Sequence, residues 1–277
     1  MTGPRTDLSN VLAPDANAGR NVLVTGGGTG IGRAVAHAFA RTGAAVAICG
    51  RRPEPLEATR SELEAIGARC VAISCDVREP DRVSSMLDEV LEAFGSVDVL
   101  VNNAGGQFSA PAEDISTNGW RAVHRLTVEA AWNLTREVVT RSMMPAGGGS
   151  VTFIGFSPRR GIPGFAHASA ARAALEALAS GLALEWSRYA IRTNCVALGA
   201  IDTEGLASYG PEEVESARRQ VPLGRLGRPE EAGAVVAFLA TDAAAYVTGT
   251  TITVDGGVDA WGQAAPPPEP TPSPDAD

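Results

Sequence analysis

The chain has 277 residues, of which 44% are hydrophobic and 20% are charged, and this composition supplies a substantial core for one globular domain. Its formal net charge of −9 excludes non-specific nucleic-acid binding, because such binding requires a cationic surface. No apolar stretch approaches the roughly 18 residues that span a bilayer, and residues 1–10 lack the apolar core of a signal peptide. We therefore expect a cytoplasmic protein with neither a membrane nor a nucleic-acid partner.

Short apolar runs alternate with helical patterns along the chain. Residues 1–19 are polar, which predicts a loose N-terminal arm, and the Pro-rich acidic residues 263–277 predict a disordered tail. Strands are expected at residues 21–25, 44–49, 70–75, 97–101, 150–154, 192–197 and 251–254. Helices are expected at residues 31–42, 53–66, 80–94, 118–144, 167–188 and 229–240. This alternation predicts an α/β fold, a single domain over residues 20–262 with a doubly wound parallel sheet and helices on both faces.

The first strand ends in a glycine-rich turn, residues 25–32 (TGGGTGIG), which opens the first helix. Glycine lets the backbone turn tightly and approach a ligand, and the helix N-terminus presents free N–H groups to an anion. In a strand–turn–helix context these features favour a dinucleotide pyrophosphate over an empty βα turn. The residues expected to contact the cofactor here are Gly26, Gly28, Thr29, Gly30 and Ile31.

The ends of the second and third strands carry the next candidate contacts. Arg51 and Arg52 follow the second strand, where an acidic residue would bind the ribose 2′-hydroxyl of NAD. Arginine pairs instead with the 2′-phosphate of NADP, so the sequence favours NADP(H), and a solvated arginine pair is the alternative. After the third strand, Asp76 and Val77 could meet the adenine, or Asp76 could cap the following helix.

Small residues follow the fourth strand at residues 102–106 (NNAGG). They would let a cofactor pass over the sheet edge where open α/β sheets bind ligands, so Asn103, Ala104 and Gly105 are expected contacts. The four cysteines, in contrast, lie in or beside apolar runs without a CxxC pair or a histidine near them in sequence. They are typical of buried thiols, and the chain predicts neither a metal site nor a disulfide framework.

Two loops beside the expected site are rich in glycine and proline. The loop at residues 155–165 contains Arg159 and Arg160, which could meet the phosphates of a CoA or carrier-protein arm or form a solvated surface pair. Residues 200–221 are irregular and contain Gly205, Gly210 and Pro211, which predicts a mobile lid.

Three motifs stand in an order that resembles the short-chain dehydrogenase/reductase family: residues 25–32, residues 102–105 (NNAG) and residues 251–257 (TITVDGG). The resemblance covers about residues 19–257. It implies a Rossmann-like fold, a nicotinamide cofactor and a homo-oligomer, either a tetramer or a dimer. It also adds three expected cofactor contacts: Gly199, Ile201 and Thr203.

The chain departs from the family at the positions that handle protons. The family usually works with an Asn, a Ser and a Tyr-x-x-x-Lys, in which the Tyr transfers the proton. Aligned on that pattern, the chain has Thr127 at the Asn position, Ala168 at the Tyr position and Arg172 at the Lys position, and Ser157 is the hydroxyl nearest the Ser position. Arg172 could hold the ribose or a phosphate, but it stays protonated. Interconversion of alcohols and ketones by the Tyr–Lys route is therefore not expected.

A narrower resemblance fits residues 103–108 (NAGGQF), 167–173 (HASAARA) and 208–210 (SYG). They look like peroxisomal-type trans-2-enoyl-CoA reductases and, less closely, 2,4-dienoyl-CoA reductases, which reduce carbon–carbon double bonds conjugated to a thioester with NADPH. The second run also looks like bacterial citronellol or citronellal dehydrogenases. Conjugate reduction places charge on the thioester oxygen, where fixed donors stabilise it, so a dedicated acid is less necessary. The resemblance implies an NADPH-dependent reductase of an enoyl thioester bound to CoA or a carrier protein.

The candidate catalytic residues are Thr127, Ser157, Arg172 and Tyr209. Arg172 would hold the cofactor ribose, Thr127 or Ser157 would orient the thioester, and Tyr209 would reach the small-molecule substrate from the lid. Structural hydroxyls and a lid-packing aromatic ring are the alternatives. His167, the histidine nearest the site, could donate a proton or pack at the helix start.

Two other functions stay open because the Asn, Tyr and Lys positions are all changed. The chain could catalyse a non-standard or non-redox reaction of secondary metabolism on the same scaffold. It could also be a non-catalytic NADP(H)-binding subunit. All of these hypotheses share the cofactor site and differ only in the chemistry beside it.

Overall fold

A computed structural model describes residues 11–157 and 161–261 of the chain. Seven parallel strands form one sheet in the order β3-β2-β1-β4-β5-β6-β7, which confirms the predicted doubly wound topology. The strands are β1 (Asn21–Thr25), β2 (Ala45–Gly50), β3 (Cys70–Ser74), β4 (Val99–Asn102), β5 (Gly149–Phe156), β6 (Ile191–Leu198) and β7 (Thr251–Val254). The order reverses between β1 and β4, which pair directly, Val22 with Val99 and Val24 with Val101.

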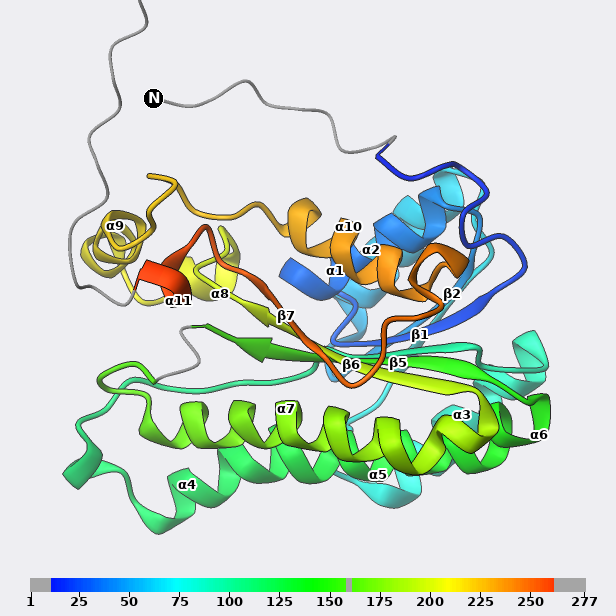
Figure 1. Cartoon of the computed structure of the whole chain (residues 1–277), viewed down its shortest axis with the longest axis horizontal. Coiled ribbons are helices and arrows are strands. Elements are labelled where there is room, and N and C mark those ends of the chain that lie inside the picture. The colour runs from blue at the N-terminus through cyan, green and yellow to red at the C-terminus, as the bar shows by residue number, and fades with distance from the viewer. Residues whose placement is uncertain (1–10, 158–160, 262–277) are drawn as a thin grey trace, which may run out of the picture.

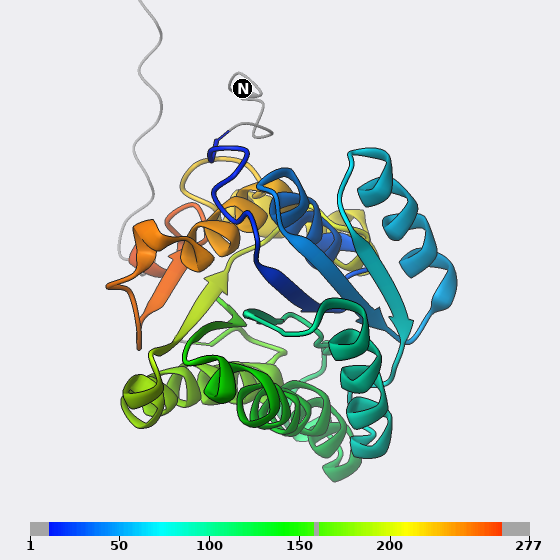
Figure 2. The same ribbon diagram turned by 90° about the vertical axis from the view of Figure 1, so that its right-hand side faces the viewer.

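Helices cover both faces of the sheet (Figure 1, Figure 2). One face carries α1 (Gly30–Arg41), α2 (Pro53–Ala65) and α10 (Pro229–Ala240), and the other carries α3 (Pro80–Phe94), α5 (Ala130–Val138) and α7 (Ala166–Trp186). Because both faces are buried, the strands are continuous apolar runs rather than alternating patterns. Val22, Leu23 and Val24 of β1, for example, are all fully buried.

The cysteines belong to these two cores, as the sequence predicted. All four are buried, and none of them forms a disulfide. Cys49, Cys75 and Cys195 pack with α3, α5 and α7, and Cys70 packs on the opposite face. Burial raises the pKa of Cys75 to about 11 and that of Cys70 to about 12, so neither thiol ionises at neutral pH.

The segment between β4 and β5 is more complex than the single helix expected at residues 118–144. It runs through α4 (Thr117–His124), a π-helical turn η2 (Arg125–Glu129), α5, a second π-helical turn η3 (Val139–Met143) and α6 (Met144–Ala146). A π-helical turn inserts one extra residue without interrupting the apolar pattern, so hydrophobic periodicity alone does not show it. β5 also extends to Phe156, so the first two residues of the expected loop at 155–165 belong to the strand.

The lid predicted as irregular contains two helices, α8 (Glu204–Ala207) and α9 (Pro211–Arg219). Thr203 caps α8, since its side-chain oxygen accepts a hydrogen bond from the backbone N–H of Leu206. Pro211 opens α9, which has acidic residues in its first turn and arginines in its last, the arrangement that complements the helix dipole. Gly210 therefore separates the two short helices, whereas Gly205 lies inside α8.

The described part of the predicted N-terminal arm is anchored to the domain. Asn17 is fully buried, and its side-chain amide donates to Thr42 Oγ1 at 2.9 Å and to the carbonyl of Ala237 at 3.3 Å. The predicted tail at residues 263–277 and the arginines Arg159 and Arg160 lie outside the described residues.

Short elements complete the chain: η1 (Ala112–Asp114), η4 (Ser187–Tyr189), η5 (Asp242–Ala244) and α11 (Val258–Trp261). Within the two described ranges, no helix combines the length and apolar character required to cross a membrane. In Figure 1, β5 and β6 point toward the end of the molecule that carries α8 and α9, so the lid lies at the carboxyl edge of the sheet.

Candidate functional site

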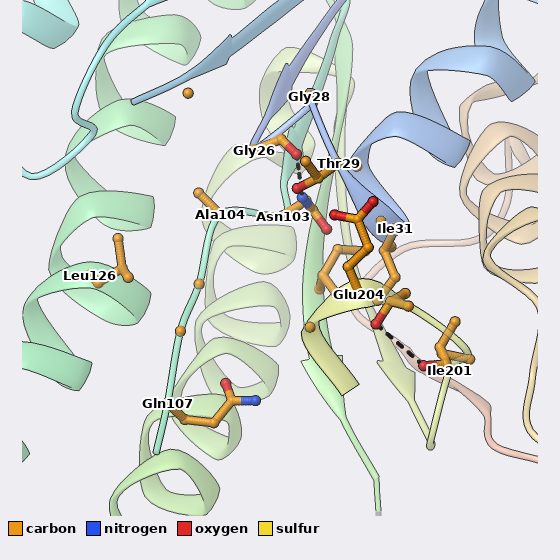
Figure 3. A pocket seen from close by; sticks show the side chains of 18 of the residues that line it. Gly26, Gly28, Thr29, Ile31, Asn103, Ala104, Gln107, Leu126, Ile201 and Glu204 are labelled. Carbon is orange, nitrogen blue, oxygen red and sulfur yellow. Dashed lines mark hydrogen bonds between the residues drawn. The ribbon is translucent and has the colours of Figure 1, made fainter. Parts of the chain in front are cut away.

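A cavity of about 730 Å³ lies at the carboxyl ends of the strands, where the sheet order reverses. Figure 3 shows it from close by, with residues from the turn after β1, the loop after β4 and the lid around it. Every residue that the sequence predicted as a cofactor contact lines this cavity: Gly26, Gly28, Thr29, Gly30, Ile31, Arg51, Arg52, Asp76, Val77, Asn103, Ala104, Gly105, Arg172, Gly199, Ile201 and Thr203.

The glycine turn has no room for side chains. A Cβ on Gly32 would lie 2.1 Å from the carbonyl oxygen of Gly26, and a Cβ on Gly28 would lie 3.0 Å from the backbone nitrogen of Leu56. Gly26 and Gly30 have φ angles of 66° and 50°, which glycine adopts without strain. In the described chain, α1 has no side-chain cap and no acidic residue in its first turn. Its first N–H groups are therefore available to an anion at the cavity.

Asn103 joins the loop after β4 to the turn after β1. Its side-chain amide donates to the carbonyl of Thr25 at 2.8 Å. The Thr25 hydroxyl oxygen also accepts from the backbone N–H groups of Asn103 and Ala104, both at 2.9 Å. These bonds fix the small residues Ala104 and Gly105 along the floor of the cavity.

Two exposed arginines stand where β2 leads into α2. Arg52 is the N-cap residue of α2, and Arg51 precedes it. Among the described residues no carboxylate forms an ion pair with either guanidinium, so both are available to a phosphate. This is the donor set that a ribose 2′-phosphate requires.

The carboxylate of Asp76 accepts hydrogen bonds from Arg78 and does not cap the following helix. Arg78 donates from Nε to Asp76 Oδ1 at 2.9 Å, and its backbone N–H donates to the same oxygen at 3.0 Å. The side-chain hydrogen bond from Arg78 is the main reason that the pKa of Asp76 falls to about 2. The capping alternative is wrong, because Glu79 is the N-cap residue of α3.

Arg172 points from α7 into the cavity between β4 and β5. Its Nη1 donates to the carbonyl of Ile154, and within the described residues its guanidinium has no carboxylate partner. Burial lowers its pKa, which shows that the charge pays a desolvation cost without a compensating anion. Gly105 allows this close approach, since a Cβ there would lie 2.2 Å from Arg172 Nη2. A partly buried cation without a carboxylate partner in the described chain, in the same cavity as the glycine turn, fits a ligand with phosphate and ribose oxygens.

The two predicted catalytic hydroxyls do not line the cavity. Ser157 is 4% exposed and donates to the carboxylate of Asp255, which also accepts from the backbone N–H groups of Gly257 and Asp259. These bonds favour the structural alternative for Ser157. Thr127, in η2, is 1% exposed, and its hydroxyl has no partner among the described residues. A buried hydroxyl requires a hydrogen-bond partner, so the Thr127 hydroxyl is available to a water molecule or a ligand atom.

Tyr209 reaches the cavity from the lid and also packs there. Its hydroxyl donates to the carbonyl of Gln107 at 3.5 Å, and its ring meets Phe165 edge-on with centroids 5.9 Å apart. It therefore joins the lid to the loops that follow β4 and β5. Burial raises the pKa of Tyr209, which keeps the phenol protonated as a hydrogen-bond donor at neutral pH.

His167 fits the packing alternative. It is fully buried, does not line the cavity, and stacks on Phe108 with ring centroids 4.3 Å apart. Burial lowers its pKa, which favours the neutral ring over the imidazolium that a proton donor would require. The sequence analysis assigned no site role to several other residues that line the cavity, including Gln107, Leu126, Phe156 and Glu204. Glu204 is exposed and belongs to no motif, so no sequence signal points to it.

Comparison with known proteins places this site in a family. Residues 26–259 match the family model described as Enoyl-(Acyl carrier protein) reductase. A solved short-chain type dehydrogenase/reductase from Mycobacterium marinum is 32% identical, with a TM-score of 0.83 over 90% of this chain and 98% of that chain. The chain belongs to the short-chain dehydrogenase/reductase family. Members of this family are oxidoreductases, and so is this chain.

Two curated relatives within the family are named as 2,4-dienoyl-CoA reductases. A Bacillus subtilis protein named a probable 2,4-dienoyl-CoA reductase is 37% identical over 85% of this chain and 95% of its own length. A Danio rerio peroxisomal 2,4-dienoyl-CoA reductase is 35% identical over 91% of this chain and 85% of its own length. A solved Beutenbergia cavernae protein, named for NAD(P)-dependent gluconate 5-dehydrogenase activity, contains NADP at low occupancy. It is 35% identical, with a TM-score of 0.83 over 89% of this chain and 99% of that chain.

Proposed function

We propose that this short-chain dehydrogenase/reductase uses NADPH to reduce a carbon–carbon double bond conjugated to a thioester, carried by CoA or a carrier protein. The observation that carries the proposal concerns Ala168 and Arg172, which lie one helical turn apart on α7. Arg172 supplies a partly buried cation to the cavity, whereas Ala168, at the usual Tyr position, is 1% exposed and has no proton to give. The relatives named 2,4-dienoyl-CoA reductases support the same chemistry.

The chain's own residues would hold NADPH along the carboxyl edge of the sheet. The turn after β1 would bind the diphosphate through backbone N–H groups, and Arg51 and Arg52 would bind the 2′-phosphate. Asp76 would face the adenine, and Arg172 would bind the ribose on the nicotinamide side. When bound, the cofactor supplies the hydride.

Hydrogen-bond donors at the open end of the cavity would stabilise the charge that develops on the thioester oxygen. Conjugate reduction delocalises that charge, so positioned donors contribute more than a strong acid does. Tyr209 is a protonated phenol on the cavity wall, and Thr127 has a buried hydroxyl without a partner in the described chain. Because Thr127 does not line the cavity, we assign thioester orientation to Tyr209, and proton delivery at the α-carbon to water.

The cofactor preference gives a direct prediction. Replacing both Arg51 and Arg52 by alanine is expected to raise the Kd for NADPH about 10- to 100-fold, because each charge-assisted hydrogen bond is worth about 1.5–3 kcal/mol before solvent screening. The Kd for NADH should change little, and titration of protein fluorescence measures both. Arg60→Ala is the matched control, since Arg60 lies on α2, pairs with Glu57 and Glu64 and does not line the cavity. Equal weakening of both cofactors would contradict the assignment.

Turnover with thioesters tests the reaction itself. The purified protein and NADPH are combined with trans-2-enoyl-CoA and 2,4-dienoyl-CoA esters of several chain lengths, and NADPH oxidation is followed by absorbance. We expect turnover with at least one of these classes, and mass spectrometry should find two added hydrogens on the acyl chain. NADPH binding without turnover on any thioester would instead support a non-catalytic cofactor-binding subunit or a different substrate class.

A further inference from the structure

Glu204 brings a carboxylate to the anion-binding end of the cavity. It is the first residue of α8 and lines the cavity together with Gly28, Thr29 and Gly30. In Figure 3 its side chain extends from the lid toward the turn, on the side where Thr29 and Ile31 lie. The family model and the relatives' names assign nothing to this residue, and its charge opposes the ligand that the turn is built to hold.

The backbone around Glu204 is fixed against the turn. A Cβ on Gly30 would lie 3.4 Å from Thr203 Cγ2, so the residue before Glu204 is in contact distance of the turn. Thr203 Oγ1 accepts from the N–H of Leu206 at 3.2 Å, which holds the start of α8. One residue earlier, the N–H of Asp202 donates to the carbonyl of Gly227 at 2.8 Å. The local fold therefore places the backbone of Glu204 against the turn, and its exposed side chain extends from there toward Thr29 and Ile31.

The negative charge of Glu204 is not neutralised by an ion pair within the described residues. Arg33, in the first turn of α1, is a cation whose pKa is raised by the charge of Glu204. The pKa of Arg33 is raised chiefly by its hydrogen bond to Glu62, and the charges of Glu204 and Glu230 add to the rise. Arg33 is already engaged by Glu62, at 2.8 Å from Nε and 2.7 Å from Nη2. Glu204 thus faces the diphosphate position with its charge largely uncompensated.

We propose that Glu204 sets the residence time of the cofactor by repelling its diphosphate. This inference rests on the proposed use of NADP(H) in the cavity. Arg51, Arg52 and Arg172 attract the two ends of the dinucleotide, and Glu204 opposes the negative charge between them. The carboxylate weakens binding and speeds dissociation. Faster release matters because loss of the oxidised cofactor, rather than chemistry, limits turnover in many enzymes with lids.

Charge-neutralising variants test the proposal. Glu204→Gln keeps the shape of the side chain and removes its charge, and Asp202→Asn is the matched control, because Asp202 is exposed, carries the same charge and does not line the cavity. Binding of NADPH is followed by protein fluorescence, and dissociation by stopped-flow displacement. We expect E204Q to lower the Kd for NADPH about 3- to 10-fold, mainly through slower dissociation, and D202N to leave it unchanged. The gain should shrink at high salt, which screens charge repulsion.

A ligand without the diphosphate separates this effect from a general change in the cavity. Adenosine 2′-monophosphate would occupy the adenine end only, so E204Q should not change its affinity. An E204Q protein that binds NADPH as the parent does, or more weakly, overturns the proposal, and weaker binding would mean that the carboxylate holds a ribose hydroxyl. Failure of the unmodified protein to bind NADPH, while it binds NADH, would overturn the cofactor assignment instead. In that case, the Kd values of the E204Q and D202N proteins for NADH test the role of Glu204 independently of the cofactor preference.

Discussion

Replacing Arg172 by methionine is expected to weaken NADPH binding about 10- to 100-fold and to lower kcat/KM at least as much. The guanidinium is partly buried beside Gly105, and among the residues described its hydrogen-bond acceptor is the carbonyl of Ile154. A charge in this setting gains most of its stabilisation from the ligand, and a lost charge-assisted hydrogen bond costs about 1.5–3 kcal/mol. Stability should change by less than about 1 kcal/mol, because the lost bond to Ile154 is offset by the removal of a desolvated charge.

A second partly buried arginine provides the control. Arg192 on β6 donates to the carbonyls of Val247 at 3.1 Å and Leu239 at 2.7 Å, and it does not line the cavity. Each carbonyl also accepts from another side chain, Val247 from Asn194 and Leu239 from Ser150. Arg192→Met should therefore lower the free energy of unfolding by about 1–2 kcal/mol, through the loss of two hydrogen bonds, and leave the Kd for NADPH unchanged. Urea unfolding and fluorescence titration measure the two quantities. If Arg172→Met loses stability but binds NADPH normally, Arg172 is structural and its assignment to the ribose is wrong.

The largest expected loss of stability comes from Gly32→Ala. The added Cβ would lie 2.1 Å from the Gly26 carbonyl oxygen and 2.5 Å from Asn103 Nδ2, so the turn and the loop after β4 must both move. Overpacking of this severity costs about 3 kcal/mol or more. The variant should also lose NADPH binding, because the backbone N–H groups at the start of α1 no longer converge on the position proposed for the diphosphate. Thermal unfolding with and without NADPH measures both effects.

Gly181→Ala is the matched control for that substitution. Gly181 also lies inside a helix, α7, and a Cβ there meets no atom within 4 Å. Alanine should raise the free energy of unfolding by about 0.5–1 kcal/mol, because it restricts the unfolded chain without strain in the helix. If Gly32→Ala behaved like Gly181→Ala and kept its affinity for NADPH, the tight packing of the turn would not be required for binding.

The residues predicted to contact a cofactor come together at one cavity because the sheet is parallel. Arg51, Asn103 and Gly199 lie far apart in the chain, yet each follows a strand, and parallel strands end at one edge. The lid was predicted less well. Its glycines predicted an irregular segment, although Thr203 and Pro211 are ordinary helix-start signals, and the structure has short helices after both.

The sequence by itself determined the sheet, the buried thiols and the glycine turn at the cavity, because apolar runs and glycine turns act locally. Only the tertiary structure decided how the polar groups are used. Ser157 is bound by Asp255, 98 positions later, Arg172 reaches the cavity without a carboxylate partner in the described chain, and Glu204 lies beside a turn that precedes it by more than 170 residues. Hydrogen bonds and charge repulsion depend on distances of a few ångströms between segments remote in sequence. No local pattern encodes such distances, so only the packed fold specifies them.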